Sequence, residues 1–372
     1  MDKPRFLPRT ALQTLLDALN RQGFRTLGPT VQDGAIQYLD LQSVDQLPHG
    51  MHDAQSPGSY RLNRHDTARC FAWANGPQAL KPALFSSREV LWTSTRDAGG
   101  KLGFRAAQDK PPPLAVIGVR ACDLAALGLQ DRHFLDTVKD PYYAARRKEL
   151  FLVAVNCTHA ADTCFCSSTG DGPRATSGYD IVLSELDDGY LLDAGSERGR
   201  SFAAELPSRA ASAAQLAQAE RDIEAAARQQ VRALPGRQLR DTLFARLKHP
   251  RWEQVAERCL SCGNCTGVCP TCFCHAESDS PALGGESTEH LREWDSCFSL
   301  GHSYLHGFVV RPETVQRYRQ WLTHKLGSWH DQYGRSGCVG CGRCITWCPV
   351  GIDITAEANA LCDANDGIGE TQ

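Results

Sequence analysis

No run of apolar residues in this chain is long enough to cross a membrane. Among its 372 residues no stretch reaches the roughly 18 consecutive apolar side chains that a spanning helix needs. The first residues, Met1 to Arg5, lack the apolar core of a secretory signal peptide. Excess basic charge is also missing, because 40 Lys and Arg face 43 Asp and Glu for a net charge of −3, whereas nucleic-acid-binding proteins usually carry a basic stripe. We therefore expect a cytoplasmic protein with no membrane span and no nucleic-acid partner.

Signatures of nucleotide binding are missing as well. No segment resembles a phosphate-binding P-loop, and Gly170–Pro173 lacks the third glycine and the strand-to-helix setting of a dinucleotide fingerprint, so it predicts a turn. The 12 histidines are scattered. Without a flavin or nicotinamide signature, the chain is not expected to run a two-electron reaction by itself.

Cysteine, in contrast, is abundant, with 17 residues in the chain. A disulfide framework fits poorly, because the count is odd, no export signal precedes the chain, and the cysteines lie too close together to pair without strain. Five cysteines fall in residues 1–245 and twelve in residues 246–372. Thiols grouped in this way in a reducing compartment indicate metal binding, and the uneven distribution predicts a domain boundary near residue 245.

Two cysteine runs in the second part share one spacing. The first begins at Cys259 and the second at Cys338, and in each the intervals are 3, 3 and 4 residues with a proline after the last cysteine. This is the C-x2-C-x2-C-x3-C-P run of bacterial-type ferredoxins, in which the fourth cysteine ligates the cluster of the other run. The pattern predicts two [4Fe-4S] clusters with crossed ligands. One cluster takes Cys259, Cys262, Cys265 and Cys348, and the other takes Cys338, Cys341, Cys344 and Cys269.

Structural zinc is the alternative for these runs. Zinc needs only four ligands in two C-x2-C pairs, so two complete runs of four that both end in Cys-Pro favour iron–sulfur clusters. Gly263 and Gly342, at equivalent places in the two runs, give the backbone the freedom to curl around a cluster.

The first part contains a second group of cysteines. Cys122 and Cys157 each follow a predicted strand, and loops after neighbouring parallel strands meet at one edge of a sheet. Thr-Cys-Phe-Cys occurs at 163–166 and again at 271–274. A third cluster held by Cys122, Cys157, Cys164 and Cys166 is one interpretation. The alternative is four buried free thiols that pack as small hydrophobic groups.

Other residues near these motifs have open roles. Arg120, beside Cys122, could donate hydrogen bonds to a cluster or pair with an acid. Cys272, Cys274 and Cys297 lie outside the two runs without an assigned role. We expect Cys70 and Cys362 to be ordinary thiols.

The fold class follows from hydrophobic patterning. Apolar runs at 114–119 and 150–155 have the length and β-branched content of buried strands, with helical segments between them, and a hairpin is expected over 181–192. Residues 202–234 are rich in helix formers. These patterns predict an α/β domain over residues 1–245.

In the second part, helix patterns flank the cysteine runs and strand signal is weak. Residues 278–287 are expected to form an exposed loop. We therefore predict an α+β/α/β protein in which the α/β domain is followed by a mainly helical, ferredoxin-like dicluster domain over residues 246–372.

Taken together, the motifs resemble a known family. Gly118–Leu124, Asn156-Cys157 with Thr163–Cys166, and Arg258–Cys274 resemble the beta subunit of cytosolic nickel-iron sulfhydrogenases and, equally, the A-type iron–sulfur subunit of anaerobic sulfite reductase. The resemblance covers the chain from about Lys81 to Asp353. It implies a 4Fe-4S dicluster subunit that relays electrons between a flavin subunit handling NAD(P)H and a catalytic subunit of the hydrogenase or sulfite reductase type.

Two classes of function remain in competition. The first is the electron relay, which is itself not catalytic. The second is a self-contained reductase in which the extra cysteines form an open-iron site that acts on a substrate such as a disulfide. The purified chain, given a reduced dye, should turn over no substrate if it is only a relay.

Overall fold

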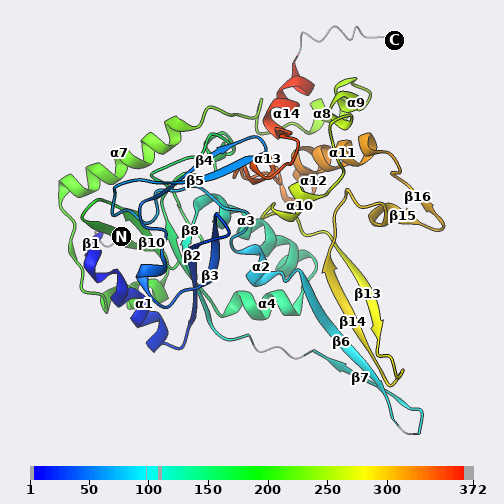
Figure 1. The fold of residues 1–372 in the computed structure, drawn as a ribbon, viewed down its shortest axis with the longest axis horizontal. Coiled ribbons are helices and arrows are strands. Elements are labelled where there is room, and N and C mark those ends of the chain that lie inside the picture. Colours follow the sequence, from blue (N-terminus) through cyan, green and yellow to red (C-terminus); the bar gives the residue numbers. More distant parts are fainter. Residues whose placement is uncertain (1–3, 98, 108–110, 364–372) are drawn as a thin grey trace.

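The computed structural model describes residues 4–97, 99–107 and 111–363, and its body is built on one large mixed sheet (Figure 1). Four central strands, β2, β8, β9 and β10, run parallel, and the outer strands pair antiparallel. In spatial order the strands are β12 (Arg209–Ala210), β1 (Arg5–Pro8), β11 (Gly189–Ala194), β10 (Ile181–Glu185), β9 (Leu150–Val155), β8 (Leu114–Val119), β2 (Arg25–Gln32) and β3 (Ala35–Asp40). The two predicted buried strands and the hairpin are confirmed.

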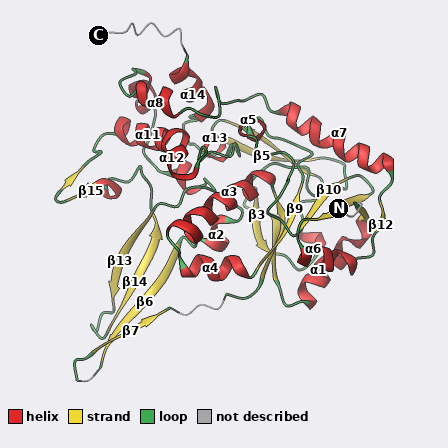
Figure 2. Ribbon diagram, turned by 180° about the vertical axis from the view of Figure 1, so that it is seen from behind, coloured by secondary structure: helices red, strands yellow, loops and turns green. Residues whose placement is uncertain are grey.

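Helices cover both faces of this sheet because its central strands are apolar on both sides. Phe151 and Val153 of β9 pack with α1 (Leu12–Arg21) and α6 (Glu197–Ala204). Leu152, on the opposite face, packs with α3 (Ala121–Asp131) and α4 (Pro141–Lys148). Figure 2 shows α1 and α6 on one side of the sheet and α3 and α4 on the other.

The helix-rich segment 202–234 is not one helix. It is divided into the end of α6, the short strand β12 and the long helix α7 (Ala213–Gln229), which begins at a capping box formed by Ser212 and Gln215. Pro207 lies between α6 and β12, where a helix would need the N–H that proline lacks. Helix propensity therefore predicted the elements but not the break.

A second, four-stranded sheet projects from the body in the order β13-β14-β6-β7 (Figure 1). Its strands are β6 (Arg88–Arg96), β7 (Leu102–Ala106), β13 (His275–Pro281) and β14 (Ser287–Trp294). The predicted loop at 278–287 is therefore wrong, since most of it belongs to a hairpin. The sequence of β13 is polar and mostly exposed, so it has no apolar alternation that could have revealed a strand. β6 precedes residue 245 and β14 follows it, and the two pair along their length.

The C-terminal part is helical around the cysteine runs. Its helices pack on a core that includes Trp252, Tyr318, Trp321 and Leu361. They are α9 (Arg251–Ala256), α10 (Asn264–Gly267), α11 (Thr314–Thr323), α12 (Trp329–Tyr333), α13 (Arg343–Thr346) and α14 (Ile354–Cys362). With β13, β14 and the short pair β15 (Tyr304–Leu305) and β16 (Phe308–Val309), this part contains both helices and strands. None of the described helices is long and apolar enough to span a bilayer.

Candidate metal centres

The first cysteine run faces a cavity that also receives cysteines of the second run. Cys259, Cys262 and Cys265 line it together with Cys344 and Cys348. Cys348 is the residue that the crossed pattern predicts as the fourth ligand here, so the structure brings all four predicted residues to one place. The remaining side chains of the wall are mostly apolar: Leu260, Phe298, Tyr318, Trp321, Val350, Ile352 and Ile354.

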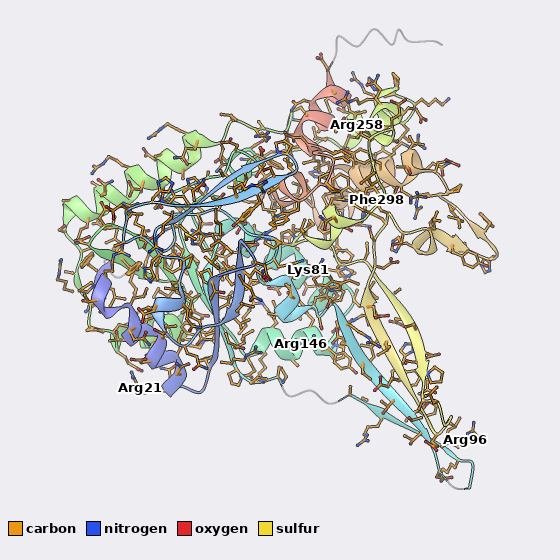
Figure 3. The ribbon with its side chains drawn as sticks, viewed as in Figure 1. Arg21, Lys81, Arg96, Arg146, Arg258 and Phe298 are labelled. Atoms are coloured by element: carbon orange, nitrogen blue, oxygen red, sulfur yellow. The ribbon has the colours of Figure 1, made fainter. Side chains whose placement is uncertain are left out.

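Aromatic rings close one side of this cavity. Phe298, labelled in Figure 3, lies with its ring centroid 6.3 Å from Tyr318 and 6.0 Å from Trp321, both on α11. These side chains keep water away from the sulfur atoms. A dry, apolar setting of this kind is one of the factors that set the potential of an iron–sulfur cluster.

The two runs repeat one backbone hydrogen bond. The Ser261 N–H donates to Cys259 Sγ at 3.4 Å, and the Gly340 N–H donates to Cys338 Sγ at 3.5 Å. Both donor residues have positive φ, 51° at Ser261 and 64° at Gly340. Each run therefore curls so that an amide faces the sulfur of its first cysteine, where it can offset negative charge on a thiolate.

The glycines expected to permit this curl occupy equivalent positions. Gly263, at φ 73°, precedes α10, and Gly342, at φ 74°, precedes α13. A left-handed residue is tolerated best as glycine. A one-turn helix follows in each run, and it places the third cysteine toward the interior.

The second predicted ligand set also converges. Burial raises the pKa of the Cys344 thiol well above its ordinary value, and the nearby sulfurs of Cys338, Cys341 and Cys269 raise it further. Burial likewise raises the pKa of Cys265 in the first set. Buried thiols of this kind hold their protons, and metal binding releases them.

The arrangement fits clusters better than a single metal ion. Zinc holds each thiolate at about 2.3 Å, so its ligands crowd around one point. Within the described ranges, no three His, Cys, Asp or Glu side chains converge closely enough to bind one ion. Cysteines spread around a common cavity suit a cubane, which is wider than one ion.

The third predicted group meets in a separate cavity. Cys122, Cys157, Cys164 and Cys166 line it, as does Cys341 from the second run. Cys122 lies in the first turn of α3, directly after β8, and Cys157 follows β9. The parallel pairing of β8 and β9 brings these loops together at one edge of the sheet, as the sequence predicts.

Comparison with known proteins supports the assignment of the C-terminal part. Residues 258–352 match the family described as "4Fe-4S dicluster domain". Over 344 residues the chain is 35% identical to the sulfhydrogenase 2 subunit beta of Pyrococcus furiosus, an alignment that covers 90% of this chain and 100% of that protein. The chain belongs to the sulfhydrogenase beta-subunit family. No solved structure gives a significant match.

As a member of this family with a dicluster domain, the beta-subunit chain is an iron–sulfur electron-transfer subunit with two [4Fe-4S] clusters. The predicted resemblance and the predicted pair of clusters are confirmed. The assignment of individual cysteines to each cluster stays a prediction.

Several residues at these centres gave no sequence signal of their own. Arg343, in the second run of this beta-subunit chain, forms a two-pronged ion pair with Asp123 of α3, at 2.7 and 3.0 Å. Both side chains are almost completely buried. The pair fixes the second cysteine run against the loop that carries Cys122, and sequence distance hides it because 220 positions separate the partners.

The cysteines without an assigned role lie beside the second set. The Cys272 thiol and Cys269 share a hydrogen bond that lowers the pKa of Cys269 well below its ordinary value. The buried Lys325 ammonium donates to Thr271 Oγ1 at 2.9 Å. Burial opposes its charge, yet the neighbouring sulfurs of Cys269 and Cys272 raise the pKa of Lys325 well above its usual range. A cation therefore lies next to the second set.

Gly340 offers a test of how tightly the second run packs on the N-terminal part. A Cβ at Gly340 would lie 2.5 Å from the Cys166 backbone nitrogen. Gly340→Ala should lower the free energy of unfolding by more than about 2 kcal/mol, because a left-handed alanine costs about 1–2 kcal/mol and a backbone clash is added. Thermal unfolding of the iron-loaded chain measures the effect.

Gly334→Ala is the matched control. Gly334 has a similar φ of 69° and nothing within 4 Å of its virtual Cβ, so only the cost of the left-handed backbone, about 1–2 kcal/mol, is expected. Equal losses in the two variants would show that the approach of Gly340 to Cys166 is unimportant for stability.

Proposed function

We propose that this chain relays electrons between a flavin subunit that handles NAD(P)H and a catalytic subunit of the hydrogenase or sulfite reductase type. The observation that carries the proposal is the shared wall between the two cysteine sets. Cys344, proposed as a ligand of the second cluster, also lines the cavity of Cys259, Cys262 and Cys265. Iron–sulfur clusters take up and release electrons over a wide range of potentials, and two adjacent centres form a path.

The proposed ligands are those of the crossed pattern. Cys348 lies in the first cavity beside the first run, and Cys269 lies near Cys344 of the second. This geometry supports ligation of each cluster by three cysteines of one run and one of the other. We propose residues 246–372 as the dicluster domain and residues 1–245 as the domain on which its second run is seated.

The surroundings favour a relay over a self-contained reductase. Cys122, Cys164 and Cys166 are buried, so a substrate disulfide has no approach to their sulfur atoms. Across the described residues, the walls of the first cavity are apolar rings, aliphatic side chains and cysteines, with no acid or base to exchange protons with a substrate. A relay needs neither substrate access nor proton transfer.

The relative is by its name the beta subunit of a sulfhydrogenase, which supports a place in a multi-subunit complex. We propose that this complex works in the cytoplasm, where the many thiols of the chain stay reduced. The expected partners are a flavin-binding protein that handles NAD(P)H and a catalytic metalloenzyme subunit.

Anaerobic purification with an affinity tag on this chain tests the proposal. We expect a flavin-containing partner and a catalytic partner to co-purify, with nickel marking a hydrogenase and sirohaem a sulfite reductase. The chain separated from its partners should accept electrons from a reduced dye and turn over neither hydrogen, sulfite nor a disulfide. Steady turnover by the isolated chain would overturn the relay and support the reductase.

A further inference from the structure

The cavity at the edge of the large sheet is built from cysteines that come from three separate segments. Cys122 is in α3, Cys157 is in the loop after β9, and Cys164 and Cys166 lie just before and at the start of α5 (Cys166–Thr169). All four line the cavity. From this geometry we propose that these four cysteines bind a third [4Fe-4S] cluster, next to the second cysteine run.

Polar side chains around this cavity point hydrogen-bond donors at the sulfur atoms. Asn75 Nδ2 donates to Cys122 Sγ at 3.1 Å, and Gln230 Nε2 donates to Cys166 Sγ at 3.4 Å. The orientation of the Gln230 amide is fixed by the Ser167 N–H, which donates to its oxygen at 3.0 Å. Donors aimed at sulfur stabilise thiolates and iron-bound sulfur, whereas free thiols that pack as hydrophobic groups need none.

Arg120 brings a positive charge that has no acidic partner. Its side chain is 1% exposed, and its guanidinium donates to the Phe71 and Trp73 carbonyl oxygens at 2.9 Å each and lies 4.0 Å from Cys157 Sγ. Within the described part of the chain no carboxylate forms an ion pair with Arg120, and none lines the cavity. Of the two roles open for Arg120, the geometry favours hydrogen bonding to a cluster.

A buried cation without a counter-charge is costly. Four thiolates around a [4Fe-4S] core carry a net negative charge in both oxidation states, so the bound cluster would neutralise the guanidinium. The same charge should favour the reduced, more negative state of the cluster. Arg120 is therefore a positioning residue that tunes the potential of the site.

The cavity shares its wall with the second run. Gly340 and Cys341 line it, and the Phe165 N–H donates to the Gly340 carbonyl oxygen at 2.8 Å. Because Cys341 is a proposed ligand of the second cluster, a third cluster would be separated from the second by little more than one side chain. Electron tunnelling falls steeply with distance, so this arrangement extends the path into the N-terminal part.

Iron analysis of the full chain tests the site directly. After anaerobic reconstitution with iron and sulfide, three clusters predict about twelve irons per chain, against about eight for two clusters. Cys164→Ser should lower the content to about eight and remove one paramagnetic species on reduction. Cys362→Ala, which changes a cysteine of α14 outside all three sets, should keep about twelve.

A content of about eight irons in the unaltered, folded chain would overturn the site, and so would about twelve in Cys164→Ser. Arg120→Gln supplies a second readout that does not depend on losing a ligand. The variant should keep about twelve irons and shift the midpoint potential of one cluster to a more negative value, while Arg120→Lys should shift it less. Unchanged potentials in both variants would remove Arg120 from the account. The iron count is independent of the partners, so it can fail while the proposed relay stands.

Discussion

Cys344→Ala should cost the chain one complete cluster. The sulfur of Cys344 lies near Cys338, Cys341 and Cys269 in a buried setting, and without it one iron would be left without its ligand and open to water and oxygen. We expect a loss of about four irons per chain, together with one of the paramagnetic signals of the reduced protein.

The stability of the chain should fall as well. A bound metal centre contributes folding free energy that the metal-free chain lacks, and loss of a metal site is among the few single changes that cost more than about 4 kcal/mol. Thermal unfolding under anaerobic conditions measures this loss. Cys362→Ala, made at the end of α14, is the control and should leave both iron content and unfolding temperature unchanged. The same behaviour in the two variants would contradict the proposed ligand set.

The second large effect is expected at the buried ion pair between the two parts of the chain. Arg343 and Asp123 have side chains that are each 1% exposed, and Arg343 Nε also donates to the Gly76 carbonyl oxygen at 2.9 Å. Removing one partner of a buried pair leaves an uncompensated charge and costs about 3–5 kcal/mol. Asp123→Ala should therefore lower the free energy of unfolding by that amount.

Two further variants separate the ion pair from the mere loss of an aspartate. Asp241→Ala removes the partner of Arg240 in a pair whose aspartate side chain is 89% exposed, and exposed pairs contribute only about 0–1 kcal/mol. The double variant Asp123→Leu/Arg343→Met replaces both charges by apolar groups and should recover much of the loss. If Asp123→Ala costs no more than Asp241→Ala, the pair does not hold the second run in place.

The parts of the fold that follow from local pattern were predictable. β8 and β9 are short, continuously apolar runs, and such runs are typical of central parallel strands. Their parallel pairing made the meeting of Cys122 and Cys157 predictable too. The crossed approach of Cys348 to the first run follows from the repeated spacing alone.

The rest depends on contacts that no local pattern encodes. The strand β13 is recruited by backbone hydrogen bonds to β14, and its polar side chains alternate with no buried face. Arg343 and Asp123 meet only when the two parts of the chain are packed together. Asn75 and Gln230 act on Cys122 and Cys166 from segments far away in the sequence, so their role appears only in three dimensions.

Rapid-freeze electron paramagnetic resonance on the purified complex tests the relay most directly. After NAD(P)H is added, signals of reduced [4Fe-4S] clusters in this chain should appear after reduction of the flavin and before the product of the catalytic subunit. In the complex that carries Cys344→Ala, the flavin should still be reduced while electron delivery to the catalytic subunit stops. Product formation at an unchanged rate in that variant, with one cluster absent, would contradict the account.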